Sequence, residues 1–431
     1  VERALIMALA DRSPSDDPAA IVPDWNDRYA ERLRDVYRNH RNDPDVAALF
    51  AEALMNRTPW QLWDIKTGKP AVGADTLEAR TVLEQAIARP GGMAHPGLLH
   101  LYVHLMEMSP EPQTALRAAD ALRGLVPDAG HLVHMATHID VLCGLYKSVV
   151  DGNGRAIVAD RKYAARQGAG NFYTLYRCHD FHFRIYGAMF LGQLQPALEA
   201  ADDLIASLPE DLLRIDSPPM ADWLEGFVPM KLHVLIRFGR WADIIATPLP
   251  KDRDLYSVTT AMTHYARAVA HAASGDVIAA EHEARAFEAA YARVPPSRYL
   301  FNNTCRDILA IASEMLRGDG ELARGPASAD LLEEGQREVP REGERPQRRP
   351  LRLEASADDV RFVGRRPRKE CTALREGPAW TVQNDCVGHR LKLQTSRCLR
   401  NQKSRARTSF RANPRLPSAS TRAASPRGDP A

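Results

Sequence analysis

The chain has 431 residues, of which 45% are hydrophobic, so it is long enough to bury a large core. No run of 18 apolar residues is present, which excludes a membrane-spanning helix and a membrane partner. The GxxxxGK[ST] motif of nucleotide-binding loops is absent, so we expect no nucleotide cofactor. Six scattered cysteines without a CxxC motif favour free thiols and a cytoplasmic location.

The net charge of +2 conceals two different kinds of sequence. Residues 331–431 carry 23 Lys and Arg against 12 Asp and Glu, whereas the rest of the chain carries 34 against 43. We therefore expect one folded domain over residues 1–325 and a different segment over residues 326–431.

Helix signals dominate the first 325 residues. Asp-Pro and Ser-Pro pairs mark helix starts at Asp17, Asp43 and Ser109, because the first residue caps the helix and proline fits its first turn. Apolar residues recur at helical spacing, and no strand with alternating polarity is evident. The sequence predicts an all-α fold. DGNGR at 151–155 is typical of a turn.

A repeated turn organises these helices. Glycine is followed by an apolar residue two positions later and a small or apolar residue five positions later, at Gly144, Gly192, Gly239 and Gly275, with a degenerate copy at Pro110. Prolines follow the second helix of a pair, at positions 127, 209, 248 and 295. Helix pairs of this kind bury their apolar faces by stacking, which predicts a solenoid.

This pattern resembles the tetratricopeptide repeat. A closer resemblance, to a family of bacterial and fungal tetratricopeptide-repeat (TPR) proteins of uncharacterised function, is carried by HPGLLHLYVHLMEMSPEPQTALRAADALRGLVPDAGHLVHMATHID, YRCHDFHF and RFGRWADIIATPLP. It covers roughly Glu2 to Gly325 and implies a TPR-like helical solenoid, fragmentary at both ends relative to the family. It implies no activity.

The Arg-, Pro- and Ser-rich segment 326–431 has little helical periodicity. Such a composition buries too little apolar surface to offset chain entropy, so we expect a disordered or non-homologous basic tail. Only Trp380 and Phe410 could interleave its charges with aromatic rings, which makes nucleic acid an unfavoured partner.

Eight of the fourteen histidines lie between His95 and His182. His100, His104 and Glu107 share one helical face, and His131, His134 and His138 share another. His179 and His182 form a third such pair. Each set precedes a repeat turn, and in the TPR register these positions face the concave groove. We expect the three first helices to lie side by side and their imidazoles to converge.

Converging imidazoles with a carboxylate suit a divalent transition metal. The predicted ligands are the seven histidines and one glutamate of the three sets, namely His100, His104, Glu107, His131, His134, His138, His179 and His182. A zincin-type peptidase is disfavoured, because Leu101 stands where HExxH requires glutamate. Asp140, Glu107 and Asp180 are candidates for an outer shell, and Glu107 or Asp180 for a catalytic base.

Three uses of the histidines stay open: a metal site, a groove for an anionic or polar ligand, and a structural role. The first functional hypothesis is an interaction scaffold whose histidine-lined groove binds a protein, a peptide or a small polar ligand and could hold a metal. The alternative is a metal-dependent hydrolase or oxidoreductase that uses the same histidines. The sequence does not decide whether the protein is an enzyme.

Overall fold

The computed structural model describes residues 1–12, 24–301 and 303–324. The expected tail, residues 326–431, lies outside the described residues. The longer helices of the first half are α1 (Glu2–Arg12), α2 (Asp24–Asn39), α3 (Pro44–Met55), α4 (Thr76–Ile87), α5 (Pro96–Met106), α6 (Leu116–Leu122), α7 (Gly130–Leu142) and α8 (Tyr146–Gln167). Those of the second half are α9 (Tyr173–Phe190), α10 (Leu194–Ala206), α13 (Met230–Arg237), α14 (Trp241–Ala246), α15 (Ser257–Ala273), α16 (Val277–Tyr291) and α17 (Cys305–Arg324).

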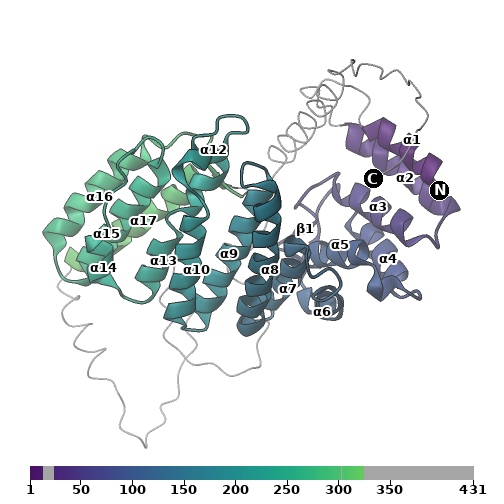
Figure 1. Cartoon of the computed structure of the whole chain (residues 1–431), viewed down its shortest axis with the longest axis horizontal. Helices are drawn as coiled ribbons and strands as arrows, with labels where there is room; N and C mark the ends of the chain where they lie inside the picture. The colour runs from purple at the N-terminus through teal and green to yellow at the C-terminus, as the bar shows by residue number, and fades with distance from the viewer. Residues whose placement is uncertain (13–23, 302, 325–431) are drawn as a thin grey trace, which may run out of the picture.

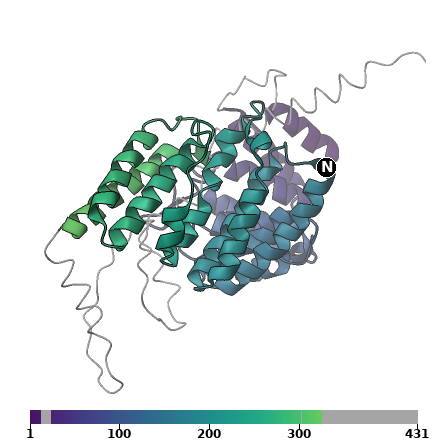
Figure 2. The same cartoon turned by 60° about the vertical axis from the view of Figure 1, so that its left-hand side comes forward.

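Helices that follow one another in the chain pack against one another. The array runs from α1 and α2 at one end to α15, α16 and α17 at the other (Figures 1 and 2). The prediction of an all-α fold with packed neighbouring helices is confirmed. Among the described residues, no helix combines the length and the apolar character needed to cross a membrane.

The predicted turn glycines share one backbone geometry. Gly144, Gly192, Gly239 and Gly275 all have positive φ, between 63° and 81°, which a residue with a Cβ adopts only at a cost. At each turn the following residue donates its N–H to the carbonyl five positions back, at 2.8 or 2.9 Å, as Leu145 does to Asp140. This bond satisfies a carbonyl that the helix end leaves open. Each new helix then begins two residues after the glycine.

Two of the segments between successive turn glycines, Gly144 to Gly192 and Gly192 to Gly239, are longer than the segment from Gly239 to Gly275. Helix α8 is 22 residues long, which lengthens the step between Gly144 and Gly192. Between α10 and α13 the chain forms α11 (Glu210–Leu213), α12 (Met220–Leu224) and the 3₁₀ helix η3 (Glu225–Phe227). The prediction of DGNGR as a turn was wrong, because these residues lie inside α8. A Cβ at Gly152 would stand 2.6 Å from Cγ2 of Thr137, so glycine allows α8 to approach α7 closely here.

Short hairpins and 3₁₀ turns fill the connections. Strands β1 (Trp63–Asp64) and β2 (Lys69–Pro70) pair antiparallel, as do β3 (Tyr299–Leu300) and β4 (Asn303–Thr304). The 3₁₀ helices η1 (Gly92–Ala94) and η2 (Pro112–Ala115) flank α5. The indole of Trp63 donates to the carbonyl of Leu105 at 2.7 Å and so fixes the first hairpin to the end of α5.

Two large apolar cores divide the array. One is built from α1 to α7 and the other mainly from α8 to α17. Helix α7 turns Met135, Ala136 and Ile139 toward the first core. Its other face, with His134 and His138, meets α9, whose Cys178 and Phe181 belong to the second core. The histidines thus occupy the junction between the two cores.

Candidate metal centre

The three histidine-bearing helices lie next to one another. Helix α5 packs on α7, and α7 packs on α9, as the repeat pattern predicts. Six of the seven predicted histidine ligands fall into two groups of three. In each group one ring nitrogen per residue lies within 4.8 Å of the other two. We name them the outer triad (His100, His104, His131) and the inner triad (His134, His138, His179).

The inner triad is buried. The relative exposures of His134, His138 and His179 are 0%, 2% and 8%. Their rings pack against one another and against Phe183 of α9, with centroids 4.7–4.8 Å from it, and Phe301 lies 4.5 Å from the ring of His179. The sequence placed these residues on the wall of an open groove, but the inner triad lies inside the protein.

One nitrogen of His134 is held as a proton donor. The amide nitrogen of Asn153 donates to the carbonyl of Val149 at 2.8 Å and to the hydroxyl of Thr137 at 3.1 Å. The amide oxygen of Asn153 must then face His134, whose Nδ1 lies 2.6 Å away. An amide oxygen only accepts, so Nδ1 of His134 carries the proton.

Glu107 holds one histidine of each triad. Its Oε1 lies 2.9 Å from Nδ1 of His104 and its Oε2 lies 2.5 Å from Nδ1 of His138. Burial would raise the pKa of Glu107, but the adjacent His138 and His104 hold it below its ordinary value. Each oxygen of this buried carboxylate lies against an imidazole nitrogen, so Glu107 is placed to orient imidazoles and poorly placed to act as a free base.

The proton on Nδ1 leaves Nε2 of His134 with a lone pair, and a single proton on Nδ1 of His138, facing Glu107, would leave Nε2 of His138 with one as well. The two atoms face each other at 2.8 Å. Two lone pairs at this distance repel unless a proton or a metal cation lies between them. Burial, with His138 adjacent, lowers the pKa of His134 well below its ordinary value, which disfavours a second proton on His134 itself. A tetrahedral ion with metal–nitrogen bonds of about 2.0–2.1 Å spaces its ligands about 3.3 Å apart, so the rings need to open slightly.

His179 completes the inner triad from α9. Burial and the surrounding histidines lower its pKa well below the ordinary value, so it is neutral and can offer a lone pair. Within the described part of the chain its Nδ1 has no hydrogen-bond partner. A buried nitrogen without a partner is costly, and a metal ligand bond would satisfy it.

Asp180 lies behind the inner triad. Its Oδ1 is 3.2 Å from Nδ1 of His134, and its carboxyl group lies against that of Asp160. Burial raises the pKa of both groups, and for Asp180 the neighbouring Asp160 raises it further. Tyr173 donates to Asp160 at 2.8 Å. Two buried carboxyl groups this close disfavour a charge on both, and neither oxygen of Asp180 has a hydrogen-bond partner among the described residues.

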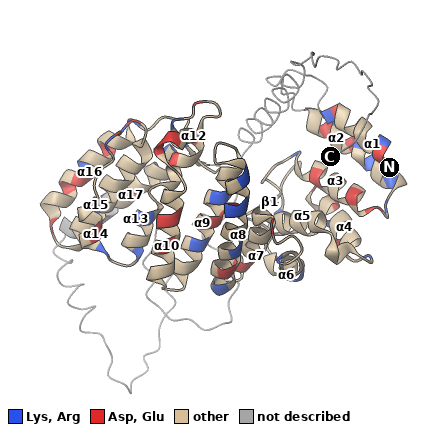
Figure 3. Ribbon diagram, in the orientation of Figure 1, with Lys and Arg blue, Asp and Glu red and all other residues tan. Residues whose placement is uncertain are grey.

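Helix α8 supplies these supporting residues although it carries no predicted ligand. Its inner face contributes Asn153 and Asp160, both buried, while Lys and Arg are frequent on the rest of the helix (Figure 3). Sequence reasoning missed Asn153, because DGNGR suggested a turn. A helical register through both glycines would have placed it on the face toward α7.

His182 does not join either triad. It packs against Tyr186, Phe227 and Phe301, and neither ring nitrogen has a hydrogen-bond partner among the residues described. Burial, with His233 nearby, lowers its pKa from 6.5 to about 3. Its predicted role as a ligand is not supported by this position.

Replacement of His182 by phenylalanine tests this burial through pH. In the unfolded chain His182 binds a proton below about pH 6.5, whereas in the folded protein it does so only below about pH 3. The free energy of unfolding therefore falls as the pH drops from about 6.5 to about 3. At about pH 5 the loss is about 2 kcal/mol. We expect His182→Phe to lose about 2 kcal/mol less than the wild type between about pH 7 and pH 5, measured by urea unfolding. Equal losses would show that His182 is not a buried neutral group.

Asp140 was a candidate for the outer shell, but its carboxylate is used elsewhere. It is fully buried, and its two oxygens accept from the two terminal nitrogens of Arg123, each at 2.6 Å. This bidentate pair ties the end of α6 to α7. His95 is also occupied, since its Nδ1 accepts from the N–H of Leu98 and caps α5.

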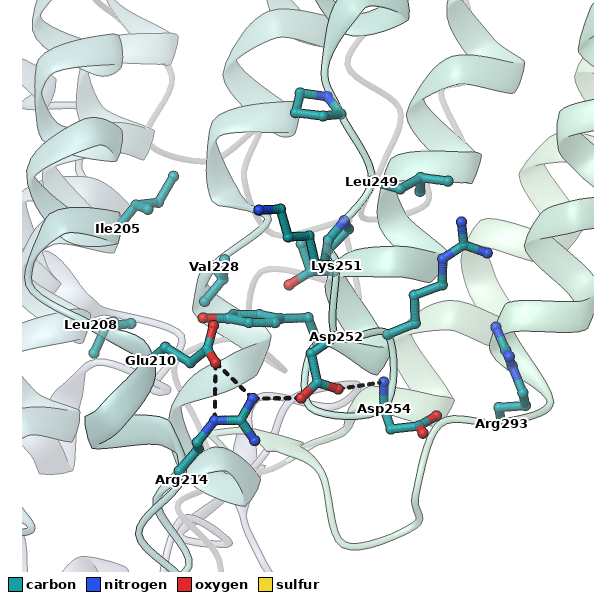
Figure 4. Close-up of a pocket in the computed structure, with 15 residues that line it drawn as sticks. Ile205, Leu208, Glu210, Arg214, Val228, Leu249, Lys251, Asp252, Asp254 and Arg293 are labelled. Carbon is teal, nitrogen blue, oxygen red and sulfur yellow. Dashed lines mark hydrogen bonds and ion pairs between the residues drawn. The ribbon is translucent and has the colours of Figure 1, made fainter.

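A large recess lies away from the histidines. It has a volume of about 1000 Å³ and is lined by residues of α10, α11 and α15 and by the segment 248–254 before α15 (Figure 4). Arg214 crosses it and pairs with Glu210 and Asp252, each at 2.6 Å. No histidine lines this recess, and Arg214 is already paired.

The chain was compared with models of protein families, with curated proteins and with solved structures, and none of these comparisons gave a match.

Proposed function

We propose that this protein is a TPR-like helical-repeat protein that binds a divalent transition-metal ion at the inner triad. The repeat assignment is supported by the four turns of identical geometry, each closing one helix and opening the next. The metal assignment is supported above all by the opposed Nε2 atoms of His134 and His138, 2.8 Å apart.

The chemistry of the donor set narrows the ion. Three imidazoles, with a carboxylate facing Nδ1 of His138 and an amide oxygen facing Nδ1 of His134, suit zinc, iron, copper or nickel. When bound, such an ion would supply Lewis-acid or redox chemistry; the residues here would hold it and exclude water. Calcium and magnesium prefer oxygen ligands and fit poorly.

Burial of the inner triad favours a metal site over the other uses that the sequence left open. A groove that binds a peptide needs accessible side chains, whereas the inner triad is enclosed by α5, α7, α9 and Phe301. Partner binding by this protein would use other surfaces. Catalysis as a hydrolase or oxidoreductase would need an open coordination position and a free base, and Glu107 is already engaged by two histidines.

Metal-dependent stabilisation tests the proposal. Zn²⁺ added to metal-free protein at about 100 times its dissociation constant should raise the free energy of unfolding by about 2.7 kcal/mol. The variant His179→Ala should lose the part of this gain that comes from the inner triad, because His179 is one of its three proposed ligands. His282→Ala, on α16, is the matched control and should keep the gain. Equal stabilisation of His179→Ala and His282→Ala would refute the inner triad as the site.

A further inference from the structure

The outer triad has its own metal-binding geometry. The Nε2 atoms of His100, on α5, and His131, on α7, lie 3.3 Å apart. This matches the spacing of about 3.3 Å between two ligands on a tetrahedral ion with metal–nitrogen bonds of about 2.0–2.1 Å. The ring of His104 lies one turn along α5, with its centroid 4.7 Å from that of His100.

The third ligand of this group is also oriented. Nδ1 of His104 faces Oε1 of Glu107 at 2.9 Å, so Nδ1 carries the proton and Nε2 keeps a lone pair. Nδ1 of His131 is buried and has no hydrogen-bond partner in the described ranges. The outer triad therefore repeats two features of the inner one: a carboxylate behind one imidazole, and a buried ring nitrogen without a partner.

The two triads are adjacent but distinct. The centroid of His104 lies 5.8 Å from that of His138, and the centroid of His131 lies 6.1 Å from that of His134. All three residues of the outer triad are partly exposed, whereas those of the inner triad are buried. A single ion cannot reach six imidazoles divided in this way, and the outer group has access to solvent.

We propose that the outer triad is a second divalent transition-metal site, so that one chain holds two ions side by side with Glu107 between their ligands. This rests on the proposed function, because the same carboxylate orients one ligand of each triad. The partly exposed site exchanges its ion with solvent more readily than the buried one, and the repulsion between two nearby cations weakens the second binding step.

Zn²⁺ stoichiometry tests the second site. Metal-free full-length protein is titrated with Zn²⁺, bound metal is measured after gel filtration, and Co²⁺ absorption reports the ligand geometry. His138→Ala removes an inner ligand, His100→Ala removes an outer ligand, and His282→Ala is the control. We expect two bound ions per chain in the wild type and in the control, and one in each single variant. The double variant with both His100→Ala and His138→Ala should bind no more than the weak nonspecific Zn²⁺ of the other residues.

Each other outcome overturns a defined part. If the wild type binds one ion, and either His100→Ala or His138→Ala abolishes this binding, the histidines form a single shared site and the second site is refuted. One ion lost only in His138→Ala refutes the outer site and leaves the proposed function intact, whereas one lost only in His100→Ala refutes the inner site. Two ions in every variant, or none in the wild type, refutes both. Far-UV circular dichroism checks folding, and His100→Gln and His138→Gln replace any alanine variant that does not fold.

Glu107→Gln adds a readout specific to two linked sites. A glutamine side chain can accept one Nδ1 proton but presents an N–H to the other imidazole. We expect Zn²⁺ affinity at one or both sites to fall about 10- to 100-fold while the triads remain intact. Unchanged affinity at both sites would contradict the orienting role of this carboxylate.

Discussion

Replacement of Asn153 by leucine is expected to weaken Zn²⁺ binding about 10- to 100-fold, although Asn153 is not a ligand. Its amide oxygen, 2.6 Å from Nδ1 of His134, is what points the Nε2 lone pair of that ring at His138. Leucine has the same number and branching of side-chain heavy atoms and cannot accept the proton. The substitution also leaves Nδ1 of His134 with only Asp180 nearby, so the metal-free protein should lose about 1–3 kcal/mol. Calorimetric titration and urea unfolding measure the two effects.

Asn153→Asp separates the two effects. Aspartate keeps an oxygen for Nδ1 of His134 but loses the N–H groups that donate to Val149 and Thr137. We expect Zn²⁺ affinity equal to or above that of the wild type, together with reduced stability of the metal-free protein. If both variants bind Zn²⁺ as the wild type does, the hydrogen bond to His134 has no part in metal binding.

Replacement of Arg123 by leucine should destabilise the metal-free protein more than any of the other substitutions. Asp140 is fully buried on α7, and its two oxygens depend on the Arg123 guanidinium. Without this partner a buried carboxylate is left uncompensated, which costs roughly 3–5 kcal/mol. Urea unfolding of the metal-free protein gives the value.

The double variant Arg123→Leu with Asp140→Leu is the control for that prediction. Removing both charges removes the desolvated carboxylate as well, so the double variant should recover much of the stability lost by Arg123→Leu. A double variant as unstable as the sum of its single changes would show that lost packing, rather than an unpaired charge, causes the effect.

Much of the helical arrangement could be predicted because it is local. Each turn has a positive φ that favours glycine, and the next helix begins at an apolar residue two positions later. Gly192 and Leu194 therefore mark a turn and a helix start in the sequence itself. The spacing of His131, His134 and His138 depends only on helical periodicity. Their approach to His100 and His179 follows from the stacking of successive helix pairs.

The remainder depended on contacts that local spacing does not encode. Phe301 reaches His179 from a hairpin more than a hundred residues away, so the enclosure of the inner triad could not be predicted. His182 shares a helical face with His179 in sequence, yet its ring lies among Phe227 and Phe301. Asn153 was hidden because two flanking glycines suggest a turn, whereas Gly152 lets α8 approach Thr137 closely.

The position of the histidines between the two apolar cores has a mechanical consequence. An array in which each helix packs mainly on its neighbours in the chain can unfold from either end in separate pieces. An ion bound by both α7 and α9 would link the helices of the first apolar core to those of the second. Metal content would then determine whether the chain melts as two blocks or as one.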